Sequence, residues 1–229
     1  LYTGAGANLN IVNAAQFQPD LVWIKNRSNA QSHILFDSVR GVNLELSSNF
    51  ANPQSTYSGV SSFNSNGFSV GTADGNTNGY TYVGWQWKGG NSSGSSNTSG
   101  TITSTVSANT TCGFSVVKYT GNGVSGATVG HGLGIAPSMI IIKDYLSASN
   151  YNWIVYHTSL GNTNFLNLNT TSASSASSAI WNNTSPTSTV FTIGNSVTLN
   201  TNGNSLVAYC FAEIAGFSKF GSYTGNGST

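Results

Sequence analysis

The feature that most constrains the fold of this chain is an internal repeat. Residues 2–6 read YTGAG, residues 119–123 read YTGNG, and residues 223–227 read YTGNG again. Longer matched blocks follow the first two of these segments in the same order, pairing residues 17–25 with 135–143, 32–41 with 152–161, 67–71 with 190–194, and 78–88 with 202–213. Matched blocks in a fixed order indicate that one domain of about 100 residues has been duplicated.

The matched blocks have the patterns of β-strands. Short apolar runs follow Pro19 and Pro137, VWIK in the first copy and IIIK in the second, and such runs are typical of strands buried on both faces. The last block alternates instead, so its successive side chains point to opposite faces of a sheet. One face carries the large side chains Val83, Trp85 and Trp87, matched by Val207, Tyr209 and Phe211, and the other carries Gly84 and Gln86, matched by Ala208 and Cys210.

Turns rich in glycine and asparagine separate these strands. Asn78-Gly79 and Asn202-Gly203 predict type I′ hairpin turns, in which both central residues have positive φ. We predict an all-β fold of two tandem antiparallel β-sandwich repeats, jelly-roll-like in form. A solenoid is the weaker alternative, because the repeat is long for a single coil. The predicted segments are a first β-sandwich repeat (1–90), a Ser/Thr/Gly-rich linker or edge segment (91–112), a second β-sandwich repeat (113–215) and the start of a third repeat or an exchanged strand (216–229).

The last of these segments has two interpretations. GFSKFGSYTG at 216–225 matches GFSVVKYTG at 113–121, the opening of the second copy. The simpler interpretation is a window cut from a longer array of repeats. The alternative is strand addition, in which Phe217, Phe220 and Tyr223 pair with a neighbouring subunit in a head-to-tail assembly.

Composition excludes several classes of partner. Only 6% of the residues are charged and the net charge is +1, with seven scattered basic residues that form no cluster for phosphate groups. We therefore predict no nucleic-acid partner. No apolar run is long enough to span a bilayer, so we also predict no membrane partner. Cys112 and Cys210 are expected to be buried free thiols, with one bridge between them as the alternative.

No pattern of residues predicts a catalytic, metal or cofactor site. The six acidic residues form no recognisable pair of the kind that glycoside hydrolysis requires, and the three histidines lack zinc-ligand spacing. GHGLG at 130–134 lacks the residues of a nucleotide-binding loop and predicts a tight turn. Asp74-Gly-Asn76-Thr-Asn78-Gly79 matches the first half of a calcium loop, but Trp85 stands where the bidentate glutamate belongs, so a turn is favoured. We predict a non-enzymatic protein without a cofactor.

Aromatic residues are the remaining candidates for recognition. Trp23, Trp85 and Trp87 align with apolar or aromatic positions of the second copy and are expected in the core. Trp181 stands in the polar segment SAIWNNTSPTS, so we single it out, together with Trp153, as a candidate contact for a glycan or a partner.

The second copy also resembles a known family. The runs YTGNGVSGATVGHGLGIAP, WIVYHTSLGNT, WNNTSPTSTVF and VAYCFAEIAGFSKFGSYTGNG are similar to a tandem β domain of uncharacterised type that recurs in tail-fibre and other virion structural proteins of marine bacteriophages. The resemblance covers nearly the whole chain, although the first copy departs from it with WQWKGG where the second has YCFAEIAG. It implies a virion or extracellular location and supplies no catalytic or ligand residues.

Three functions follow as expectations. The first is a structural protein of a virion appendage (tail fibre, tail or capsid-attached) that acts through self-assembly, as a homo-oligomer and with other virion proteins. A charge-poor surface favours this function, because little electrostatic repulsion opposes close packing of subunits. The second is a carbohydrate-binding module that attaches to a host surface glycan. The third is a subunit of an extracellular filament or adhesin.

Overall fold

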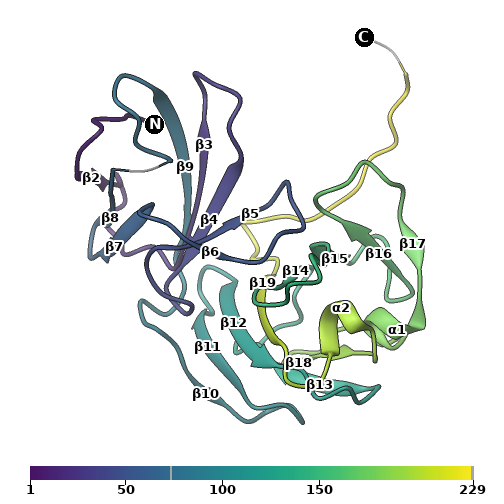
Figure 1. Cartoon of the computed structure of the whole chain (residues 1–229). Coiled ribbons are helices and arrows are strands. Elements are labelled where there is room, and N and C mark those ends of the chain that lie inside the picture. Colours follow the sequence, from purple (N-terminus) through teal and green to yellow (C-terminus); the bar gives the residue numbers. More distant parts are fainter. Residues whose placement is uncertain (73, 228–229) are drawn as a thin grey trace.

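The computed structural model describes residues 1–72 and 74–227 and is almost entirely β. The named strands pair antiparallel in four sheets, and the two helices have four residues each. Figure 1 shows an N-terminal half and a C-terminal half packed side by side. The predicted all-β class with antiparallel sheets is therefore confirmed.

The N-terminal half contains a six-stranded and a three-stranded sheet (Figure 1). The order of the first is β1-β9-β3-β4-β5-β6, and that of the second is β2-β8-β7. Their strands are β1 (Tyr2–Thr3), β2 (Leu9–Val12), β3 (Leu21–Asn26), β4 (His33–Asp37), β5 (Leu44–Ser47), β6 (Ser55–Thr56), β7 (Val60–Asn64), β8 (Gly67–Val70) and β9 (Thr81–Trp87).

The C-terminal half contains an eight-stranded sheet, β10-β11-β12-β19-β14-β15-β16-β17, and the two-stranded sheet β13-β18. Residues 91–112, predicted as a linker or an edge segment, supply β10 and β11, which extend the large sheet beyond β12. The elements are β10 (Ser95–Asn97), β11 (Ser104–Asn109), β12 (Phe114–Thr120), β13 (Ala127–Gly130), β14 (Met139–Asp144), β15 (Ile154–His157), β16 (Asn164–Asn167), β17 (Ser175–Ala176), α1 (Ser178–Trp181), β18 (Val190–Ile193), α2 (Val197–Asn200) and β19 (Ser205–Phe211).

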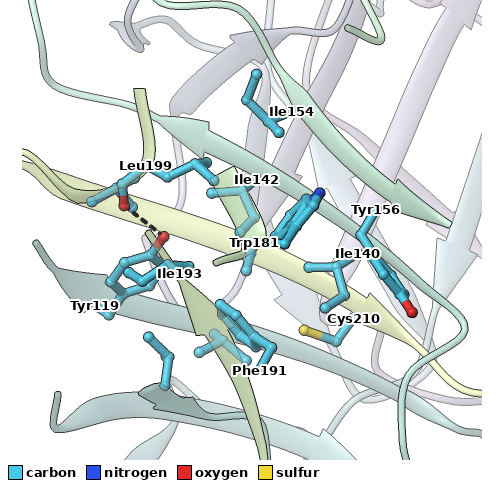
Figure 2. Close-up of a cluster of buried hydrophobic side chains, with 14 of the residues drawn as sticks. Tyr119, Ile140, Ile142, Ile154, Tyr156, Trp181, Phe191, Ile193, Leu199 and Cys210 are labelled. Atoms are coloured by element: carbon cyan, nitrogen blue, oxygen red, sulfur yellow. Dashed lines mark hydrogen bonds between the residues drawn. The ribbon is translucent and has the colours of Figure 1, made fainter. Parts of the chain in front are cut away.

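Three hydrophobic clusters hold the chain together. The first lies between the two sheets of the N-terminal half and includes Val22, Phe36 and Phe68. The second lies inside the C-terminal half, where Trp181 and Phe191 pack over the eight-stranded sheet (Figure 2). The third takes buried side chains from both halves and fills the interface between them. Its members from the N-terminal half are Leu21, Leu35, Val39 and Leu46, and those from the C-terminal half are Phe114, Val116, Ile141, Tyr145, Trp153, Val155, Val207, Tyr209 and Phe211.

The alternation predicted for β19 is confirmed by this division. Leu206, Ala208 and Cys210 belong to the cluster inside the C-terminal half. Val207, Tyr209 and Phe211 point the other way, into the cluster between the halves. Both faces of this strand are therefore buried, which explains why both carry apolar residues. Cys210 is a buried free thiol as predicted, whereas the free thiol of Cys112 is only half-buried.

The predicted type I′ turns are wrong. Gly79 and Gly203 have φ values of 78° and 82°, but neither Asn78 nor Asn202 has a positive φ. A single positive φ at the third position, supplied by glycine, is the arrangement of a type II turn. The turns precede β9 and β19 but follow irregular chain or α2 rather than a pairing strand, so the twist of a two-residue hairpin is not required here.

Two buried asparagines fasten these turns to the start of each half. Asn76 accepts a hydrogen bond from the backbone of Ala5 at 2.8 Å and donates to the carbonyls of Ala7 and Gly71. Asn200 does the same in the C-terminal half, accepting from Asn122 and donating to the carbonyls of Val124 and Gly194. Both side chains are fully buried, so each satisfies backbone groups that water does not reach.

We predict that Asn200→Ala lowers the free energy of unfolding by about 3 kcal/mol, because buried backbone groups lose their partners. Urea denaturation followed by circular dichroism measures this change. The exposed neighbour Asn202 provides the matched control, and Asn202→Ala should stay within about 0.5 kcal/mol of the parent. Equal effects of the two substitutions would contradict this account of Asn200.

Candidate functional site

The candidate site is a groove of about 620 Å³ where the two halves meet. The N-terminal half lines it with Trp23, His33, Ser48 and Asn49, and the C-terminal half with the segment 168–171. A second hollow of about 310 Å³ adjoins it, since Trp23 and His33 line both; Trp85 and Trp87 complete its wall. We refer to the two hollows together as the tryptophan groove.

The six-stranded sheet positions the aromatic floor of the tryptophan groove. Trp23 on β3 lies directly opposite Trp85 on β9, and Trp87 lies two residues further along the same face. The ring centroids of Trp23 lie 6.5 Å from Trp85, 6.4 Å from Trp87 and 6.4 Å from His33. Opposed strands and period-two alternation thus bring four aromatic rings to one patch of the sheet.

The expectation that these tryptophans lie in the core is wrong for Trp85, which is 46% exposed, and holds only in part for Trp23 and Trp87, which are half-buried. Their face of the sheet points away from the inner core, since Gly84 on the opposite face of β9 lies against Phe68. Trp23 and Trp87 pack at the edge of the interface between the halves. The corresponding residues of the C-terminal half are buried only because the other half covers them. Matching the two sequence copies identified which side chains share a face of the sheet, but not whether the other half of the molecule buries that face.

The two tryptophans singled out from the sequence offer no surface to a ligand, so that prediction is corrected. Trp181 is 1% exposed and packs edge-on against Tyr156, with 5.6 Å between ring centroids, as the last residue of α1 rather than in a loop (Figure 2). Trp153 is fully buried between the halves. Its indole N–H donates to the carbonyls of Ser47 at 3.0 Å and Phe50 at 3.1 Å. Both indoles are structural anchors.

The C-terminal aromatics divide into one that packs and two that do not. Phe220 lies 6.4 Å from Phe211 and 6.4 Å from His157, measured between ring centroids. Phe217 and Tyr223 are 68% and 95% exposed. Residues 212–227 contain no strand, and this segment ends in an extended stretch that points away from both halves (Figure 1). Strand exchange stays a prediction, and residues 228 and 229 of its segment lie outside the described residues.

Two of the acidic residues, Asp20 and Asp144, accept several hydrogen bonds within the fold. Asp20 accepts from five donors, among them the backbone of Gly89 and the hydroxyls of Ser38 and Ser107. Asp144 accepts from two backbone amides and from Asn204. In residues 1–72 and 74–227, no group of three or more His, Cys, Asp or Glu side chains is placed to hold a metal ion. The Asn76 amide, part of the calcium-like sequence, is occupied by backbone hydrogen bonds.

The lining of the tryptophan groove carries no charged side chain, although Lys25 lies opposite His33 on the neighbouring strand. None of the residues that line it is Asp, Glu, Lys or Arg. Desolvation, reinforced by nearby Lys25, lowers the pKa of His33, so this imidazole is uncharged at neutral pH. The groove is therefore lined by aromatic rings, hydroxyls and amides, with no charged side chain among the lining residues.

Comparison with known proteins identifies the family alone. A family model described as "Domain of unknown function (DUF7483)" matches residues 1–229, the whole chain, so the chain belongs to this family. Comparison with curated proteins finds no match, and comparison with solved structures finds none. Within the described part of the chain, no helix is both long and apolar enough to cross a membrane.

A pH-dependent stability follows from Glu45 on β5. Burial, together with the charge of Asp74, raises the pKa of this carboxyl to about 6 from its ordinary 4.5. Between these two values the folded chain binds more protons than the unfolded chain, so this group stabilises the fold as the pH falls. Because Glu45 is partly exposed and solvent screens its charge, we expect its contribution to the free energy of unfolding to change by about 1 kcal/mol.

Urea denaturation of the parent and of Glu45→Gln at pH 7 and pH 5 measures this contribution. We predict that the parent gains stability relative to the glutamine variant on acidification. Burial lowers the pKa of His131, which destabilises the fold as the pH falls. Because the parent and the Glu45→Gln variant share this contribution, the difference between them excludes it. A constant difference between the two proteins at both pH values would contradict the raised pKa of Glu45.

Proposed function

We propose that this member of the DUF7483 family is a non-enzymatic structural protein of a virion appendage, made of two tandem β-sandwich repeats locked into one rigid unit. The observation that carries the proposal is the buried interface between the halves, where aromatic side chains of both halves pack together and Tyr209 of one half binds the Asp37–Arg40 pair of the other. An interface of this kind suits a part whose work is to hold shape and spacing.

Matching connections support the tandem duplication. The strand order β1-β9-β3-β4-β5-β6 corresponds, element by element, to β12-β19-β14-β15-β16-β17. The hydrogen bonds of Asn76 and Asn200 reach matched backbone positions in the two halves. In each half a second, smaller sheet covers one face of the large sheet over a common core. This is the layer arrangement of a β-sandwich.

A buried ion pair supports the rigid connection between the repeats. Asp37 and Arg40 form a salt bridge of 2.6 Å with both side chains fully buried. Tyr209, from the other half, donates its hydroxyl proton to the same Asp37 oxygen at 2.8 Å. Burial and the neighbouring carboxylate raise the pKa of this phenol, so it remains a donor. Because a buried charge needs all its partners, the halves are held in one docking position.

Further polar contacts across the interface support the same conclusion. The ammonium of Lys143 donates to the carbonyl of Ala51 at 2.6 Å, and the backbone N–H of Gln54 donates to the carbonyl of Tyr145. Asp20 binds the hydroxyl of Ser107 on β11 at 2.8 Å while holding the backbone that follows β9. The connection between the repeats is therefore held at several points and is not a free linker.

The virion assignment rests on the resemblance of the sequence repeats to tail-fibre and other virion structural proteins of marine bacteriophages. A chain with only 6% charged residues has a charge-poor surface, which favours close packing with further copies or with other virion proteins. The segment 216–227 repeats the opening of the second copy and exposes Phe217 and Tyr223. We therefore include strand addition to a neighbouring subunit as the mode of self-assembly. A subunit of an extracellular filament or adhesin is the alternative with the same physical basis.

Immunogold electron microscopy tests the location. Antibodies raised against the chain are applied to purified particles of the virus that encodes it, or to the producing cells. We expect label on a fibre, tail or capsid-attached appendage. Label confined to the cell interior, with particles free of it, would contradict the virion assignment.

The interface makes its own prediction. Tyr209→Phe removes the one hydrogen bond that the C-terminal half donates to the Asp37 carboxylate, so the free energy of unfolding should fall by about 2 kcal/mol. Chemical denaturation monitored by tryptophan fluorescence measures it. Tyr223→Phe, at a 95% exposed position, is the matched control and should leave stability unchanged. A Tyr209→Phe protein as stable as this control would contradict the described interface.

A further inference from the structure

Each half contributes one matched residue, His33 or Trp153, that faces a segment of the other half. Trp153 packs closely against that segment, whereas His33 leaves a groove. Trp87 and Phe211, which occupy matched positions, meet at the centre with 6.0 Å between their ring centroids. On one side of this point, Trp153 of the C-terminal half packs against the chain at Ser47–Phe50. On the other side, His33, the match of Trp153, lines a groove with the segment 168–171.

The difference in side-chain size explains the opening. Trp153 is fully buried, stacks on Tyr209 with 6.3 Å between the ring centroids, and uses its indole N–H twice. The smaller His33 leaves the corresponding space unfilled, and the groove of about 620 Å³ remains there. The surrounding backbone is alike in the two halves. The side chain of Asn49 accepts a hydrogen bond from the backbone N–H of His33, and the side chain of Asn169 accepts one from the backbone N–H of Trp153.

The chemistry of the open groove selects a class of ligand. Its floor is made of indole rings, of which that of Trp85 is the most exposed. Its rim carries the exposed hydroxyls of Thr170 and Thr171 beside the amides of Asn49 and Asn169. The oxygens of these two amides also accept from the backbone N–H of His33 and Trp153. A sugar ring has an apolar C–H face that packs on an indole and hydroxyls at its edge that bond to such a rim. The volume lies within the range of small-molecule sites.

We propose that the tryptophan groove binds a neutral oligosaccharide, with one sugar ring packed on Trp85 and hydroxyls bonded along the rim. An acidic sugar would find no cation among the lining residues, and a phosphate would find none either. The inference does not depend on the virion role, since it rests on the geometry between the two halves. It gives the chain a recognition site that is separate from its assembly contacts.

A glycan array of neutral and acidic oligosaccharides, probed with the full chain, tests the proposal. Isothermal titration calorimetry with the strongest neutral binder then compares three variants. Trp85→Ala should lower the affinity by about tenfold, because it removes one ring-packing contact. His33→Trp copies the residue of the closed side and should also weaken binding by filling the groove. Tyr223→Ala, an exposed aromatic outside the groove, should bind like the parent.

Thermal melts of each variant separate lost binding from lost folding, and His33→Trp keeps the test valid if Trp85→Ala proves unstable. Neutral binders that depend on Trp85 and His33 support the proposal. Three results would overturn it: no neutral binder at millimolar concentration, binding confined to acidic glycans, or binding that neither groove variant alters. Competition by a peptide of residues 216–227, without any glycan binding, would instead identify the groove as a docking site for a second copy.

Discussion

The buried carboxylate of Asp37 joins the two halves of this molecule, together with the hydrophobic cluster between them. Arg40 neutralises it from the same half, and Tyr209 completes its hydrogen bonding from the other half. Removing a charge from water is costly, and the cost is offset only when every partner is in place. The two halves therefore dock in one position, in which Trp153 is covered and Trp85 is not.

The docking position gives matched residues different roles. Ile141, Tyr209 and Phe211 on the outer face of the C-terminal sheet are covered and stabilise the interface. Their counterparts Trp23, Trp85 and Trp87 occupy the same places on the N-terminal sheet but border a groove. The two aromatic faces match in sequence, and the packing of the halves covers one of them more completely than the other.

Much of the fold could be predicted from the sequence because its signals are local. Alternation in β19 specified which residues share a face, and the low charge with many turn residues indicated an all-β chain. The candidate site could not be predicted from the sequence, because the exposure of its tryptophans depends on how the two halves pack. Trp181 stood in a polar segment yet lies in the core, since α1 turns it inward. Trp85 matched a core residue yet lies at the surface. The Asn-Gly turns are not of the predicted type I′, because neither turn connects two strands that pair with each other.

The shared interface predicts that the two halves unfold as one cooperative unit. Differential scanning calorimetry of the whole chain measures this by comparing the calorimetric with the van't Hoff enthalpy of unfolding. The account predicts a single transition in which the two enthalpies agree. Two resolved transitions, each with about half of the total enthalpy, would contradict it, because the repeats would then unfold independently and the interface would not fix their relative position.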